Sequence, residues 1–133
     1  MVTFTYRAAD YGLTSDVATV TITVLPLNDV PVANNDSYTV NEDTTLGIPA
    51  PGVLGNDSDV DGDVLRAVLV DGPTNGVLNL STNGGFSYTP SLNFTGVVTF
   101  TYRAADYGLT SSVATVTITV LPLNDVPPLR RQP

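Results

Sequence analysis

Four closely spaced aspartates are the residues of this sequence most suited to chemistry. Asp57, Asp59 and Asp61 alternate with other residues, and Gly62 and Asp63 follow directly. Calcium takes about six to eight oxygen ligands, and alternating aspartates before a glycine turn allow a short loop to present several carboxylates to one ion. The spacing therefore predicts a calcium-binding loop.

This loop is not an EF-hand. An EF-hand loop ends in a bidentate Glu and enters a helix, whereas this sequence has Val68 at that position, in a segment that is typical of a strand. The missing ligands must then come from other parts of the fold. Aspartate and glycine are also ordinary turn formers, so a charged, solvated turn is the alternative interpretation.

Composition excludes several other kinds of site. The chain has no Cys, His or Trp, and its five basic residues are all arginines. It can therefore form neither disulfides nor zinc–thiolate sites, and it lacks the commonest general base. A net charge of −8 argues against nucleic acid or an anionic membrane as a partner. Acidic oxygens attract hard cations instead.

A long passage of the sequence occurs twice. Val2–Pro31 matches Val98–Pro127 except that Asp16 stands opposite Ser112, and the offset is 98 − 2 = 96 residues. A repeat of this size can fold independently. We expect a tandem array divided into the closing hairpin of a preceding repeat (1–27), a linker (28–31), one complete repeat (32–123), and a linker with a tail (124–133).

Alternation of apolar and polar residues predicts strands. One face of the segment 98–104 and one face of the segment 114–120 are apolar throughout, while threonines dominate the other faces. Five shorter strands are expected at 37–40, 44–48, 64–70, 76–80 and 86–89, and no segment has helical periodicity. About seven short strands with one wet face indicate an all-β, immunoglobulin-like antiparallel β-sandwich.

The order of several short motifs resembles a known family. The motifs are NDVP at 28–31, DSYTV at 36–40, EDT at 42–44, VLGNDSDVDGD at 53–63, GFSYTP at 85–90, NFTG at 93–96 and FTY at 100–102. In this order they resemble the bacterial cadherin-like tandem repeats of large RTX-type and VCBS-type surface adhesins. The resemblance implies an extracellular cadherin-like sandwich, commonly calcium-bound, that serves as a spacer.

Sandwich topology suggests where further cation ligands lie. If the strands alternate in direction, the linker, the aspartate loop and the turn at Asp106 gather at one end, and Glu42 and the outgoing linker gather at the other. Each junction of an array would then combine both kinds of end, which is similar to how cadherins share calcium between domains. Pro26 and Leu27 stand where cadherin linkers carry a further acidic residue. The candidate metal ligands are Asn28, Asp29, Glu42, Asp43, Asp57, Asp59, Asp61, Asp63, Asp106, Asn124 and Asp125.

Three classes of function follow from these features. The first is a non-catalytic structural spacer of an extracellular adhesin or surface filament, stiffened by Ca²⁺ and in contact with neighbouring repeats. The second is an adhesive module that binds a glycan, with Tyr107 as a candidate contact, or a like repeat. The third is glycoside hydrolysis by paired carboxylates, but the aspartates are concentrated in one turn, so we expect no enzyme.

The duplicated segment 1–27 raises a separate expectation. Its inward row of Phe4, Tyr6, Val20 and Ile22 would be exposed without a sandwich of its own. It is either disordered or pairs with another chain by strand addition, giving a homo-oligomer or a head-to-tail filament. The sequence shows neither a signal peptide nor an apolar run long enough to span a membrane, and we expect a fragment of a longer secreted or cell-surface protein.

Overall fold

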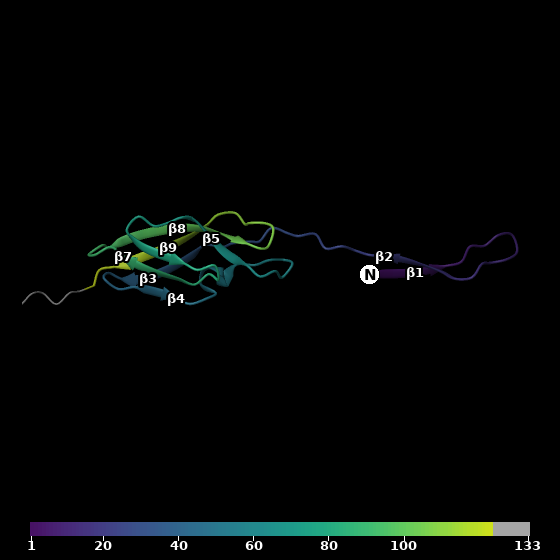
Figure 1. Cartoon of the computed structure of the whole chain (residues 1–133), viewed down its shortest axis with the longest axis horizontal. Coiled ribbons are helices and arrows are strands. Elements are labelled where there is room, and N and C mark those ends of the chain that lie inside the picture. Colours follow the sequence, from purple (N-terminus) through teal and green to yellow (C-terminus); the bar gives the residue numbers. More distant parts are fainter. Residues whose placement is uncertain (124–133) are drawn as a thin grey trace, which may run out of the picture.

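The computed structural model describes residues 1–123 and shows an all-β chain. A two-stranded hairpin precedes a sandwich of seven strands and one short 3-10 helix (Figure 1). The elements in chain order are β1 (Val2–Tyr6), β2 (Ala18–Ile22), β3 (Asp36–Asn41), β4 (Leu46–Ile48), η1 (Gly52–Asn56), β5 (Arg66–Asp71), β6 (Gly76–Leu80), β7 (Phe86–Pro90), β8 (Gly96–Ala105) and β9 (Ala114–Leu121).

The sandwich has two layers. One sheet has the strand order β3-β9-β8-β5 and the other has the order β4-β7-β6. This confirms the predicted sandwich of about seven strands, with one difference in strand direction. Strand β3 pairs with β9 in parallel, with Asp36 opposite Val116, because both strands start at the end of the sandwich where the linker enters. Alternation along a strand does not encode its neighbour's direction.

The core lies between the two sheets. The predicted inward faces of β8 and β9 are buried along their whole length, with burial alternating residue by residue. From the opposite sheet, the Phe86 ring packs edge-on against Phe100 with ring centroids 5.5 Å apart. Tyr88 and Tyr102 are completely buried, so both belong to the core. The buried inward residues of β8 and β9 are Val98, Phe100, Tyr102, Ala104, Ala114, Val116, Ile118 and Val120.

The helix η1 was not predicted. It spans five residues, too few for periodicity to reveal, and it buries Val53 completely. Gly52 has a φ of 52°, and an added Cβ there would come within 2.0 Å of the Gly84 carbonyl oxygen. Two loops therefore pack backbone against backbone at this point, and η1 fixes the start of the aspartate loop.

The N-terminal hairpin forms an ordered sheet of its own, in place of the disordered alternative. Strands β1 and β2 pair antiparallel with Phe4 opposite Val20. The register matches that of β8 and β9, where Phe100 lies opposite Val116. Figure 1 shows this hairpin lying apart from the sandwich at the end of an extended linker. The structure of residues 1–123 contains no helix that is long and apolar enough to cross a membrane.

Candidate metal centre

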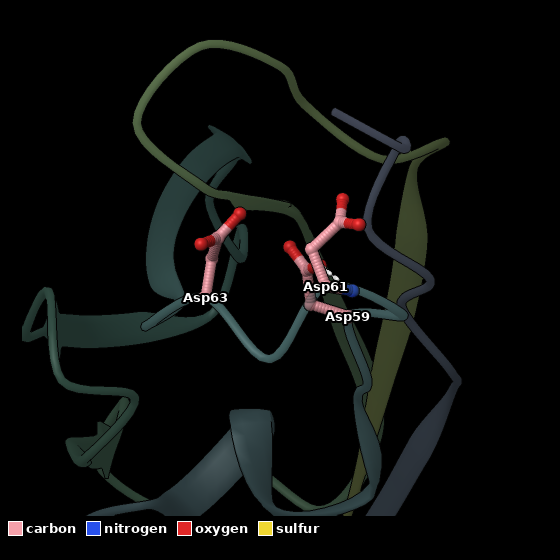
Figure 2. A group of neighbouring side chains, drawn as sticks. All are labelled: Asp59, Asp61 and Asp63. Atoms are coloured by element: carbon pink, nitrogen blue, oxygen red, sulfur yellow. Dashed lines mark hydrogen bonds between the residues drawn. The ribbon is translucent and has the colours of Figure 1, made fainter. Parts of the chain in front are cut away.

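Three aspartates of the loop between η1 and β5 converge. Each of Asp59, Asp61 and Asp63 offers a carboxylate oxygen, and these oxygens lie within 4.8 Å of one another (Figure 2). The loop is shaped by its own backbone: the Asp61 N–H donates to the Asp59 carboxylate at 2.8 Å, and the Gly62 N–H donates to the Asp59 carbonyl at 2.9 Å. Gly62 has a φ of 74°, a left-handed conformation that favours glycine.

Asp106 brings a fourth carboxylate from the turn after β8. Its side chain is 1% exposed, and its Oδ1 accepts hydrogen bonds from the Gly108 and Leu109 N–H groups at 2.8 and 2.7 Å. The Asn28 amide also donates to this oxygen at 3.5 Å. The turn therefore fixes one carboxylate oxygen with backbone donors and leaves the other, Oδ2, without a partner.

The linker before the sandwich joins the same cluster. Besides the contact of Asn28 with Asp106, the Asp29 N–H donates to Asp61 Oδ2 at 2.7 Å. Asp29 thus contributes its backbone amide to the cluster. The predicted meeting of linker, aspartate loop and Asp106 turn at one end of the sandwich matches this arrangement.

Several oxygens of these segments are buried without hydrogen-bond partners. Within residues 1–123, the buried side-chain oxygens and nitrogens that lack a partner are Asn28 Oδ1, Asp59 Oδ2, Asp63 Oδ2 and Asp106 Oδ2. All four are acceptors, and an unpaired buried acceptor costs about 1–3 kcal/mol, more when it is charged. These acceptors come from three segments, and a single cation within reach of all of them would satisfy them together. The donor set, all hard oxygen, fits calcium.

The electrostatics agree with a site that needs positive charge. Burial raises the pKa of the Asp63 carboxyl, and repulsion from Asp59, Asp106 and Asp61 adds to the increase. The pKa of Asp106 is lowered, chiefly because the Gly108 N–H stabilises its ionised form. A cation in the cluster would remove the repulsion that Asp63 experiences.

A cavity of about 220 Å³ opens beside the cluster. Asn28, Asp61 and Asp63 line it together with Pro26, Leu27 and Tyr107. The Tyr107 side chain is 77% exposed and forms part of the rim. Asn28 and the two residues before it therefore contribute a polar side chain and apolar walls to this cavity.

Asp57 lies outside this cluster, unlike the sequence prediction. Its Oδ1 accepts from the Asn34 N–H at 2.9 Å and its Oδ2 accepts from the Tyr102 hydroxyl at 2.6 Å. The Tyr102 hydroxyl also lies 2.8 Å from the Val53 carbonyl oxygen and 3.5 Å from Asp36 Oδ2. Asp57 is therefore turned toward the core by a buried phenol. The alternate spacing of the aspartates did not indicate that the Tyr102 hydroxyl is the partner of Asp57.

Asp36 is a second partner of the Tyr102 hydroxyl that the sequence reasoning missed. It begins β3 and shares the Tyr102 hydroxyl with Asp57. Burial, followed by repulsion from Asp57, raises the pKa of Asp36 to about 6. A tyrosine at an inward strand position was the only available signal, because such a buried hydroxyl requires a polar partner.

Glu42 and Asp43 lie beyond the other end of β3. Buried Glu42 accepts a hydrogen bond from the Leu123 N–H at 3.1 Å, and Asp43 accepts one from the Asn93 N–H at 3.0 Å. Both residues are separated from the aspartate loop: Glu42 holds the chain where it leaves β9, and Asp43 holds the loop between β7 and β8. The predicted ligands Asn124 and Asp125 lie outside the described residues.

Curated relatives of this chain are much longer than the chain itself. The chain is 31% identical over 141 aligned residues to integrin beta-like protein C of Dictyostelium discoideum, and 29% identical over 137 residues to integrin beta-like protein E of the same organism. The alignments cover 90% and 87% of this chain but only 7% of either relative. The similarity supports an adhesion-related module.

Solved structures of low sequence identity share the fold. An endo-fucoidan hydrolase of glycoside hydrolase family 107 is similar with a TM-score of 0.54 and 20% identity, over 92% of this chain and 19% of that chain. A nucleoside hydrolase-related protein from Saccharophagus degradans is similar with a TM-score of 0.52 and 18% identity, over 70% of this chain and 26% of that chain. These likenesses concern the fold alone.

The family assignment rests on the sandwich and its linker together. Residues 28–122 match the bacterial cadherin-like domain family. The match begins at Asn28, the linker residue that contacts Asp106, and ends just beyond β9. Domains of this family generally bind calcium, are typically extracellular or surface-exposed, and have a non-catalytic, adhesion-type fold. This chain belongs to the bacterial cadherin-like domain family.

Proposed function

We propose that this chain is a non-catalytic spacer unit of an extracellular bacterial adhesin or surface filament, and that calcium stiffens the junction before its sandwich. The observation that carries the proposal is the set of four buried, unpartnered oxygens. One belongs to the linker residue Asn28, and the other three belong to the sandwich. An ion that satisfies all four oxygens attaches the linker to the sandwich.

The ligands are expected to come from three segments. Calcium takes about six to eight oxygens, so waters or a neighbouring repeat complete the shell around the side chains of this chain. The bound ion supplies positive charge and coordination bonds that cross from the linker to the loop and the turn. The proposed ligands are Asn28, Asp59, Asp61, Asp63 and Asp106.

The charges of the aspartates explain how calcium would stiffen the linker. Two carboxylates about 4.5 Å apart repel by up to roughly 3–4 kcal/mol at an effective dielectric near 20, before salt screening. Without a cation, this repulsion works against the hydrogen bonds of Asn28 and Asp29 that hold the linker. With a cation, the same carboxylates attract a common charge. The orientation of whatever precedes the linker then becomes fixed relative to the sandwich.

Single-molecule energy transfer tests this stiffening. Because the chain lacks cysteine, dyes can be attached to Thr3→Cys in the hairpin and Thr99→Cys on an exposed position of β8. Calcium should narrow the distribution of transfer efficiency relative to chelator, and Asn28→Ala in the same background should remain broad in both conditions. Identical distributions with and without calcium in the unsubstituted linker would rule out a stiffened junction.

A second candidate function is an adhesive module that binds a glycan. The exposed Tyr107 ring at the rim of the cavity beside the aspartates favours it, because aromatic rings present an apolar body with a polar tip to a ligand. Glycan-array binding in calcium, compared between the unchanged chain and Tyr107→Ala, tests this function. Equal binding by both chains, or the absence of binding, would remove it.

A further inference from the structure

A buried phenol reaches the start of the aspartate loop from the core. Tyr102 is completely buried on β8, and its hydroxyl donates to Asp57 Oδ2 at 2.6 Å. Burial, followed by the hydrogen bond to Asp57, raises the pKa of Tyr102 well above its usual value, so the hydroxyl keeps its proton and acts as a donor. Asp57 is therefore held by a group that belongs to the packed core. The proposed calcium ligands include neither of these two residues.

The segment that leads into the aspartate loop is also held by the chain just after the linker. The second oxygen of Asp57, Oδ1, accepts a hydrogen bond from the Asn34 N–H at 2.9 Å. The next residue, Ser58, exchanges two backbone hydrogen bonds with Val32, at 2.8 and 2.9 Å. Residues 57 and 58, directly before Asp59, are thus fixed from the core on one side and from the chain after the linker on the other.

The strand that carries this phenol also leads to a proposed ligand. Tyr102 lies within β8, and Asp106 lies in the turn directly after that strand. Strand β8 is paired with β5 on one side and with β9 on the other, so the positions of Tyr102 and Asp106 are fixed relative to each other. One strand therefore holds both the start of the aspartate loop and the carboxylate whose charge repels Asp63.

We propose that Tyr102 is a positioning residue of the calcium centre, acting through Asp57 to set the distance between the aspartate loop and the Asp106 turn. The inference rests on the calcium function proposed above and adds a residue outside the set of proposed ligands. The Tyr102 hydroxyl fixes Asp57, and Asp57 fixes the backbone that continues into the ligand Asp59. Without the hydroxyl, the ion itself must order the loop, and the entropy lost on ordering opposes binding.

Two buried tyrosines allow a matched comparison. Tyr102→Phe removes one oxygen atom and leaves the ring in the core. Tyr88→Phe makes the same change at a residue that is equally buried and whose hydroxyl donates to the Asn75 carbonyl. Asn75 lies in the loop after β5, whereas the aspartate loop lies before β5. Loss of a buried hydrogen bond should lower the melting temperature of both variants, so stability alone does not distinguish them.

Calorimetric titration of the full chain with calcium separates the two variants. Tyr102→Phe should weaken calcium binding by about tenfold or more, the loss typical when groups that orient metal ligands are removed, while Tyr88→Phe should bind as the unchanged chain does. In an Asp57→Ala background, Tyr102→Phe should cause no further loss, because the phenol acts through that carboxylate. Normal binding by Tyr102→Phe, equal weakening in both phenylalanine variants, or full additivity with Asp57→Ala would overturn the proposal.

Amide hydrogen exchange in chelator tests the positioning without any ion. The Asp61 N–H donates to the Asp59 carboxylate and the Gly62 N–H donates to the Asp59 carbonyl, so both amides report the shape of the loop. They should exchange faster in Tyr102→Phe than in the unchanged chain or in Tyr88→Phe. Equal exchange in all three chains would contradict the proposal even where calcium binds. If the unchanged chain binds no calcium but Tyr102→Phe exchanges faster, the calcium function fails, while the role of Tyr102 in ordering the loop stands.

Discussion

At the scale of single residues, Asp106 has the most informative surroundings. One of its carboxylate oxygens accepts two backbone hydrogen bonds, while the other is buried without a partner. Oxygens of Asp59 and Asp63 are likewise buried without a partner, and Asp106 lies close enough to Asp63 for their charges to repel. A positive charge or a hydrogen-bond donor at this position would therefore be favourable, and the two can be distinguished by substitution.

Replacing Asp106 by Asn should have opposite effects in chelator and in calcium. The amide removes one negative charge and supplies a donor to the neighbouring carboxylates, so the free energy of unfolding in chelator should rise. Loss of an anionic ligand should weaken calcium binding at least about tenfold, which is about 1.4 kcal/mol. Calorimetric titration and thermal unfolding measure the two effects. Asp16→Asn, on the exposed hairpin, is the control, and an Asp106→Asn chain that binds calcium normally would refute the ligand role.

Asp36 should make stability depend on pH in the mildly acidic range. Its pKa of about 6 lies above the ordinary value of 3.8, so the folded state binds a proton more tightly than the unfolded state. The associated stabilisation is complete below pH 3.8 and is lost as pH rises through 6. Between pH 7 and pH 5 this contribution should therefore raise the melting temperature of the wild type relative to a chain that lacks the Asp36 carboxyl.

The variant Asp36→Asn separates this contribution from those of other carboxylates. The variant cannot titrate at this position, so its melting temperature should rise less between pH 7 and pH 5 than that of the wild type. Tyr102 and Asp57 face the residue from β8 and from the loop after η1 and are unchanged in the variant. Parallel pH profiles for the two chains would show that Asp36 does not take up the proton.

At the scale of elements, the contact between η1 and the loop before β7 positions the aspartate loop. Gly52→Ala would place a Cβ 2.0 Å from the Gly84 carbonyl oxygen at a φ of 52°. We expect a loss of about 2–5 kcal/mol in the free energy of unfolding from strain and overpacking together. Gly62→Ala, at a φ of 74° with open space around it, should cost only about 1–2 kcal/mol. Denaturant unfolding compares them, and equal losses would mean that the backbone contact is unimportant.

The elements were predicted from sequence where burial follows a simple period. Alternation between Val98 and Ala104 indicated a strand with one buried face, and every inward position of that segment is buried. The five-residue η1 lacks a period that could be recognised. The parallel direction of β3 beside β9 was also missed, because a strand's pattern encodes which face is buried and not which way its neighbour runs.

The candidate site was predicted less completely than the strands, for a similar reason. The alternate spacing predicted that Asp57 lies with Asp59 and Asp61. In the structure, Asp57 instead accepts a hydrogen bond from the hydroxyl of Tyr102, which is distant in sequence. Topology correctly suggested that Asn28 and Asp106 lie near the loop. Long-range partners of single side chains depend on tertiary packing, so local spacing alone could not determine them.

At the scale of the whole molecule, the central claim is that one calcium ion joins the linker to the sandwich. The claim gives Asn28 a special role, since it is the linker side chain with an unpartnered oxygen in the cluster. Loss of the Asn28 side chain should weaken the response to calcium without altering the hydrophobic core, because its contacts are with the Asp106 turn. A duplicated array built on this unit would then change from flexible to rod-like with calcium.

Thermal unfolding of the unchanged chain and of Asn28→Ala tests this claim most directly. Each chain is melted in calcium, in chelator and in magnesium at matched ionic strength. At a hundredfold excess over the dissociation constant, calcium should stabilise the wild type by about 2.7 kcal/mol, or about 10 °C or more, while magnesium has little effect. Asn28→Ala should show a clearly smaller calcium shift. Superimposable wild-type curves in calcium and chelator would contradict the account.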